Sequence, residues 1–180
     1  MLISAGDLKE KYTKFNDIDD ELLERKLSVI ESTIRKHTNN NFQNRLVRFN
    51  ASIEGGVIKG TSPYLKQLDT IEISNGINKG LYTIKTISET IETNEPLYDY
   101  PEQLITKIEY PIDVIEGAID LLDWELIQKG KENTGVASES ISRHNVSYVQ
   151  RTNDNTINGY PVELFNFCND YMKARFWWKK

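Results

Sequence analysis

Residues 111–129 read PIDVIEGAIDLLDWELIQK, and an apolar residue recurs in this stretch every three or four positions. This spacing places the apolar side chains on one face of an α-helix. Pro111 suits the first turn of the helix, and Gly130 suits its end. The predicted apolar stripe consists of Ile112, Ile115, Ile119, Leu122 and Leu126, and it is widened by Val114, Ala118 and Leu121.

A second stretch, residues 19–38, reads DDELLERKLSVIESTIRKHT and has the same periodicity. Acidic residues begin it and basic residues end it, as the helix dipole favours. Its stripe consists of Leu23, Leu27, Ile30 and Ile34. Burying one such side chain contributes about 1.5–3 kcal/mol. We therefore expect the two stripes to pack against each other and to hold the fold together.

Two shorter helices are predicted near the ends of the chain. The first begins at Ser4, which can cap it, and extends to about Tyr12. The other begins at Pro161. Its predicted apolar face consists of Leu164, Phe165, Cys168, Tyr171, Met172 and Phe176.

Residues 45–110 change from helical spacing to the alternation that is typical of strands. One face of the first strand is formed by Val47, Phe49, Ala51 and Ile53. Turn signals follow at Glu54-Gly55-Gly56 and at Asn75-Gly76. We expect a small barrel or a strongly curled sheet, because curling hides strand edges. The loop Asn94–Glu102 is expected to be exposed.

The composition is that of a soluble domain, with 180 residues, 38% hydrophobic and 27% charged. No apolar run is long enough to span a membrane. The single cysteine, Cys168, excludes an internal disulfide. The net charge of −5 argues against a protein that grips nucleic acid through its phosphates. A protein that lets nucleic acid pass without binding it remains compatible with this charge.

No pattern in the chain predicts a catalytic, cofactor or metal site. His37 and His144 are the only histidines, and they are far apart in sequence. We expect His37 to complement a helix end, His144 to lie in a turn and Cys168 to be a buried small hydrophobe. Asp120 and Asp123 share a helix face, where solvated acids are the usual outcome. We interpret the glycines of residues 55–61 as a turn, because the ending of a phosphate-binding loop is missing.

Residues 135–149 read GVASESISRHNVSYV and follow the long predicted helix. Val146 and Tyr148 alternate with Ser147 and Val149, and residues 143–145 can turn. The stretch predicts an extended or hairpin segment. A lone hairpin is only marginally stable in water, so this one needs a partner, either its own flanking helices or another chain. An ordinary surface hairpin is the alternative.

The order of these parts resembles the head–tail connector, or adaptor, proteins of long-tailed phages. The resemblance rests on DDELL at 19–23, the proline-started helix at 111–129, ASESIS at 137–142 with Val-Ser-Tyr at 146–148, and an aromatic and basic C-terminal helix. It covers residues 4–44 and 111–178, with residues 45–110 as an insertion. The chain departs from the family where Ala137 replaces the usual lysine and Ser142 the usual glycine.

The resemblance implies a structural virion protein and not an enzyme. Family members form a ring of about twelve subunits under the portal protein at the capsid vertex. The ring extends the DNA channel and receives a stopper or tail-completion protein, while double-stranded DNA passes without specific binding. The implied location is the head–tail interface of the virion, after assembly in the host cytoplasm.

The physical character of two segments agrees with such a role. A polar segment too short to fold alone suits strand pairing with a neighbour, and aromatic residues between basic ones suit docking. Plain core packing of the tryptophans is the alternative. The expected contacts to other subunits or partners are Ser138, Glu139, Ser140, Ile141, Val146, Tyr148, Arg175, Phe176, Trp177 and Trp178.

The sequence therefore predicts an α+β fold. Residues 1–44 and 111–180 are expected to form a bundle of about four helices, the connector core, with a hairpin arm at 135–149. Residues 45–110 are expected to form the inserted β-barrel-like lobe. A different function remains open, in which a monomer uses this lobe to bind a carbohydrate or peptide. The tyrosines expected to make that contact are Tyr64, Tyr82, Tyr98 and Tyr100.

Overall fold

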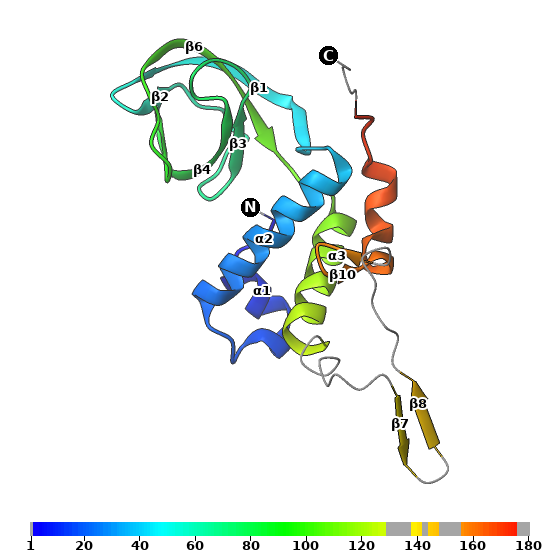
Figure 1. The fold of residues 1–180 in the computed structure, drawn as a ribbon. Coiled ribbons are helices and arrows are strands. Elements are labelled where there is room, and N and C mark those ends of the chain that lie inside the picture. Colours follow the sequence, from blue (N-terminus) through cyan, green and yellow to red (C-terminus); the bar gives the residue numbers. More distant parts are fainter. Residues whose placement is uncertain (1, 129–137, 142–143, 148–155, 176–180) are drawn as a thin grey trace. The chain divides into compact units, whose positions relative to one another are not determined.

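The computed structural model describes residues 2–128, 138–141, 144–147 and 156–175 (Figure 1). The chain divides into two compact units. One comprises residues 40–110 with Leu2, and the other comprises residues 3–39 together with the residues that follow Tyr110.

The first unit is a closed antiparallel barrel of six strands, so the predicted α+β class with a barrel is confirmed. The strands are β1 (Gln43–Glu54), β2 (Val57–Lys59), β3 (Thr70–Ile73), β4 (Gly80–Ile87), β5 (Ile91–Thr93) and β6 (Tyr100–Ile108). Their order around the barrel is β1-β2-β5-β4-β3-β6, and β6 pairs with β1 to close it. Closure leaves no strand edge open to another chain.

The barrel core follows the predicted alternation. Val47, Ala51 and Ile53 of β1 are buried, and Phe49 packs beside them. The other buried core residues are Ile58, Leu65, Ile71, Ile73, Ile84, Ile91, Leu97 and Ile105. The turn between β1 and β2 consists of Gly55 and Gly56, whose φ angles are 63° and 76°. A two-residue hairpin turn with positive φ at both positions favours glycine, so the expected turn is confirmed.

The second unit contains four helices within its described residues. They are α1 (Ala5–Lys11), α2 (Asp20–Thr38), α3 (Ile112–Asp123) and η4 (Val162–Tyr171), the last with 3₁₀ winding. Short elements complete the unit: η1 (Thr13–Phe15), a π turn η2 (Trp124–Gln128), and the paired strands β9 (Thr156–Ile157) and β10 (Tyr160–Pro161). α2 packs against α1, α3 and η4, as the expected pairing of the two apolar stripes requires (Figure 1).

The predicted cap of α1 at Ser4 is confirmed, and α2 begins within the predicted acidic stretch, with Asp19 as its cap. The Ser4 hydroxyl accepts a hydrogen bond from the Asp7 amide at 3.1 Å, and the Asp19 carboxylate accepts one from the Leu22 amide at 3.1 Å. These bonds satisfy amides that a helix start leaves without partners. The predicted stripe of α2 is confirmed, because all four of its residues are at most 1% exposed.

The predicted stripe of α3 is partly wrong. Ile112 is 67% exposed, whereas Val114, Ala118 and Leu121 have no exposed surface. The residues expected only to widen the face therefore form its centre, because α3 packs against both α2 and η4. Spacings of three and four residues allow both stripes, and the positions of the two partner helices decide between them.

Part of the predicted apolar face of the last helix is also wrong. Phe165 and Cys168 are buried as expected, but the helix ends at Tyr171 and the next residue, Met172, is 50% exposed. The unexpected contact is Phe167, whose ring lies directly over Gly117 of α3. Phe176 lies outside the described residues.

Candidate interaction surfaces

A two-stranded ribbon occupies the stretch in which most interface residues are expected. β7 (Ser138–Ile141) pairs antiparallel with β8 (His144–Ser147), and neither pairs with another strand of the described chain. Ser138, Glu139, Ser140, Ile141 and Val146 therefore lie on strands, and Tyr148 lies outside the described residues. The expectation that His144 lies in a turn is wrong, because it is the first residue of β8.

The register of the ribbon determines which backbone groups point outward. Ile141 faces His144 across a two-residue connection. In a hairpin with such a connection, the residue pair next to the turn is hydrogen bonded. Along the two strands, hydrogen-bonded pairs then alternate with pairs that are not hydrogen bonded. The pairs Ser140 with Asn145 and Ser138 with Ser147 are therefore not hydrogen bonded to each other. Their N–H and C=O groups point to the two outer edges of the ribbon.

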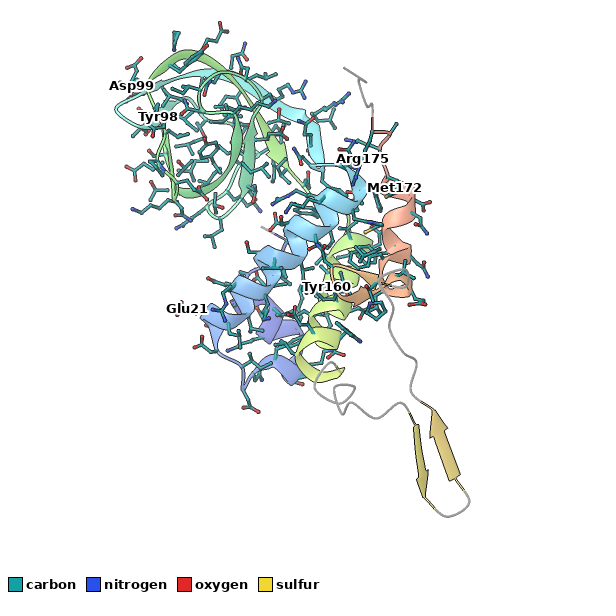
Figure 2. All side chains as sticks on the ribbon, in the orientation of Figure 1. Glu21, Tyr98, Asp99, Tyr160, Met172 and Arg175 are labelled. Atoms are coloured by element: carbon teal, nitrogen blue, oxygen red, sulfur yellow. The ribbon has the colours of Figure 1, made fainter. Side chains whose placement is uncertain are left out.

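The C-terminal segment that follows η4 is attached to the end of α2. The Lys173 amide donates to the Thr38 carbonyl at 2.8 Å, and the Asn39 side chain donates to the Ala174 carbonyl at 3.0 Å. The exposed Arg175 donates through its guanidinium to the carbonyl of Lys36 (Figure 2). Lys173 and Arg175 thus satisfy carbonyl groups that a helix end leaves without partners. The expected contacts Phe176, Trp177 and Trp178 lie outside the described residues.

His37 lies in the last turn of α2, as expected, but its environment does not favour a positive charge. Its ring packs against Phe165 with a centroid distance of 5.2 Å. Burial, and to a lesser degree the charge of Arg175, lowers the pKa of His37. The neutral ring therefore acts as a packing group in the helical unit.

Three tyrosines lie at one end of the barrel, where the loops of residues 54–57, 74–79 and 94–99 meet; Tyr82 and Tyr100 are half-buried and Tyr98 is exposed. Tyr98 is 64% exposed and Tyr100 begins β6 beside it. The neighbouring Tyr82 has a raised pKa because of burial first, and then because of Glu95 and Tyr98. Three of the four tyrosines considered for ligand binding therefore lie near one another.

Tyr64 lies apart from the other three tyrosines. Its carbonyl accepts a hydrogen bond from Lys107 at 3.1 Å, near the opposite end of β6 from Tyr100. Seven residues of a strand separate the two positions by about 23 Å. The barrel thus has aromatic residues at both ends, and only one end has a cluster of them.

Two residues of this loop end carry no sequence signal that predicts their role. Ile77 is 66% exposed, whereas the next residue, Asn78, is 1% exposed. The Asn78 amide donates to the Tyr98 carbonyl at 2.7 Å and its oxygen accepts from the Tyr98 amide at 2.8 Å. Both residues lie in a turn-rich loop, where periodicity says nothing about burial.

The helical unit contains a pocket of about 410 Å³. It is lined by Val29, Thr33, Trp124, Glu125, Asn158, Gly159 and Tyr160. The Glu125 carboxylate accepts hydrogen bonds from the Tyr160 hydroxyl at 2.5 Å and from Lys26 at 2.6 Å. Burial, and then the bond to Glu125, raises the pKa of Tyr160. These polar groups bind one another and stabilise the fold.

The remaining side chains that could react or bind a metal lie in environments that suit a structural role. Cys168 is fully buried, and burial raises the pKa of its thiol to about 12, which confirms the expected buried hydrophobe. Asp120 is exposed as expected, and Asp123 forms an ion pair with Lys14 at 2.9 Å. In the part of the chain that the structure describes, no group of three or more histidine, cysteine or acidic residues is placed to hold a metal ion.

The fold defines an α+β protein with a six-stranded antiparallel barrel inserted into a helical unit. Comparison of the chain with protein-family models found no match, and neither did comparison with curated protein sequences. Among the described residues, no helix combines the length and apolar character that crossing a membrane requires.

Proposed function

We propose that the protein is a structural component of a phage virion, a ring between the portal protein and the tail or stopper protein. The ring extends the DNA channel during head completion and head–tail joining. Its subunits assemble in the host cytoplasm and remain at the head–tail interface, and no reaction is catalysed. The proposal rests on the resemblance of residues 4–44 and 111–178 to connector proteins.

The observation that carries the proposal is the ribbon of β7 and β8. Its two strands pair only with each other among the described strands, which leaves two open edges. An open edge is a template for a strand of another chain, whereas the barrel has none. Ser138 and Ser140 offer N–H and C=O groups on one edge, and Asn145 and Ser147 offer them on the other. A ribbon with two edges suits a ring, in which each subunit has two neighbours.

The charge of the chain agrees with a channel through which DNA moves. The net charge is −5 for each subunit, so a ring of about twelve copies accumulates a strong negative field. Such a field repels the phosphate backbone and keeps DNA from adhering to the wall. We expect DNA to pass through the ring without sequence-specific contacts.

The test is electron microscopy of the purified protein mixed with portal particles, using a matched pair of variants. Ser140→Pro removes an N–H that points to an outer edge and keeps the hydrogen bonds within the ribbon, because proline is tolerated at strand edges. Ser140→Ala keeps the N–H. We expect a ring below the portal for wild type and Ser140→Ala, and its loss for Ser140→Pro. Absence of wild-type binding to portal particles would refute the proposed function.

A monomeric binding module is the second candidate, and the cluster of Tyr82, Tyr98 and Tyr100 favours it. The exposed ring of Tyr98, with two half-buried tyrosines and carboxylates beside it, is suited to binding a carbohydrate or a peptide. This function predicts a ligand-dependent rise in the thermal midpoint of a monomer. It also predicts that Ser140→Pro leaves binding unchanged, since the ribbon has no part in it.

A further inference from the structure

The loop end of the barrel is a rigid surface formed by residues 54–57, 74–79 and 94–99. The two hydrogen bonds of Asn78 with Tyr98 join two of these loops. Asp99 accepts a hydrogen bond from the Gly56 amide at 3.2 Å and thereby joins the third. Glu95 also accepts one from the Thr83 amide of β4 at 3.0 Å. Loops fixed in this way lose little conformational freedom when they bind a partner.

This surface exposes two large side chains, those of Ile77 and Tyr98. Ile77 is 66% exposed and Tyr98 is 64% exposed, and the bonds between Asn78 and Tyr98 join the two loops that carry them. Asn78 itself is 1% exposed. Tyrosine is among the residues that dominate binding at protein interfaces, particularly where its backbone is already fixed. The loop end is therefore suited to contact with an apolar segment of a partner.

The charged residues on this surface indicate the chemistry of the partner. Glu54, Glu95 and Asp99 are exposed in the three loops, and Lys79 is their only basic residue. Tyr98 and Asp99 are adjacent on the barrel surface (Figure 2). A complementary partner combines aromatic or aliphatic side chains with positive charges.

We propose that the loop end of the barrel binds the C-terminal segment of a second copy of this chain. Residues 175–180 read RFWWKK and combine three aromatic residues with three positive charges. The segment leaves the helical unit at a defined point, because residues 173–175 are bound to the end of α2. The five residues that follow Arg175 span about 17 Å when extended, enough to place several aromatic side chains on one surface.

This inference rests on the proposed function and specifies a contact within the ring. A segment of one subunit that binds a different surface of the next makes a head-to-tail contact. Repeated contacts of this kind produce either a closed ring or an open filament. Together with the ribbon edges, the C-terminal segment therefore links each subunit to the next, so that all subunits have the same orientation around the ring.

The test measures binding of a fluorescein-labelled peptide, KARFWWKK (residues 173–180), to a chain that lacks residues 176–180. Fluorescence anisotropy should show saturable binding that weakens as salt is added. Tyr98→Ala should weaken binding about tenfold or more. Asp99→Asn should weaken it less, because the amide oxygen still accepts the bond from Gly56. The matched control is Tyr64→Ala, since Tyr64 is 67% exposed but lies near the other end of β6.

The inference is overturned if the peptide does not bind, or if Tyr98→Ala and Tyr64→Ala weaken binding equally while both variants keep the wild-type thermal midpoint. It is also overturned if the peptide binds the truncated chain but not a full-length monomer. In that case the C-terminal segment of the same chain occupies the surface. Rings of Tyr98→Ala on portal particles that match those of wild type would refute this contact and leave the proposed function standing. Peptide binding as expected without any portal binding would support the contact and refute the portal role.

Discussion

Replacement of Gly117 by alanine tests how the last helix is held on α3. A Cβ atom built on Gly117 would lie 2.5 Å or less from three ring carbons of Phe167. Carbon atoms in ordinary contact are about 3.5–4.0 Å apart, so the ring has to move by about 1 Å or more. Overpacking of this kind costs about 1–3 kcal/mol, and the better helix propensity of alanine returns about 1 kcal/mol. The two effects together should lower the free energy of unfolding of Gly117→Ala by up to about 2 kcal/mol.

The sign of the effect should reverse when the Phe167 ring is absent. In a Phe167→Ala background only the helix propensity remains, so Gly117→Ala should raise the free energy of unfolding by about 0.5–1 kcal/mol. Urea unfolding followed by tryptophan emission measures this cycle. All three tryptophans lie outside residues 40–110, so the signal reports on the helical unit. Equal effects of Gly117→Ala in both backgrounds would show that the ring does not rest on the glycine.

Two further predictions concern the barrel and the buried thiol. Asn78→Ala removes two hydrogen bonds of a side chain that is 1% exposed, so it should destabilise the barrel by about 2–3 kcal/mol. Urea unfolding followed by circular dichroism measures this loss. The control Asn94→Ala, in an exposed loop, should change the free energy of unfolding by less than about 0.5 kcal/mol. An equal effect of the two substitutions would contradict the role of Asn78. The pKa of the Cys168 thiol is raised from 9.0 to about 12, so the unfolded chain releases this proton at lower pH than the folded chain. Its contribution to stability is complete below about pH 9 and falls by about 1.4 kcal/mol per pH unit above it, a slope that Cys168→Ala should remove. Rapid reaction of the native thiol with a disulfide reagent at pH 8 would argue against its burial.

The sequence predicts those parts of the fold that neighbouring residues control. The start of α1 follows from Ser4, because a cap bonds to amides only two or three residues away, and the start of α2 follows from acidic residues that the helix dipole favours. The glycine turn of residues 55–56 follows from the positive φ that such a turn requires. The extended character of residues 138–141 and 144–147 also agrees with the local pattern. The aromatic C-terminal residues are recognisable by composition alone, and their contacts remain a prediction.

Only the tertiary structure decides which faces and loops meet. The centre of the buried face of α3 depends on where α2 and η4 lie. Spacing alone therefore predicted that Ile112 is buried, whereas Ile112 is exposed and Val114 is buried. Closure of the barrel pairs β1 with β6, whose partners Phe49 and Ile105 are far apart in sequence. The barrel fold also separates Tyr64 from Tyr98 and brings Asn78 beside Tyr98. Local hydrogen bonds and periodicity are determined within a few residues, whereas these contacts depend on how distant segments share one core.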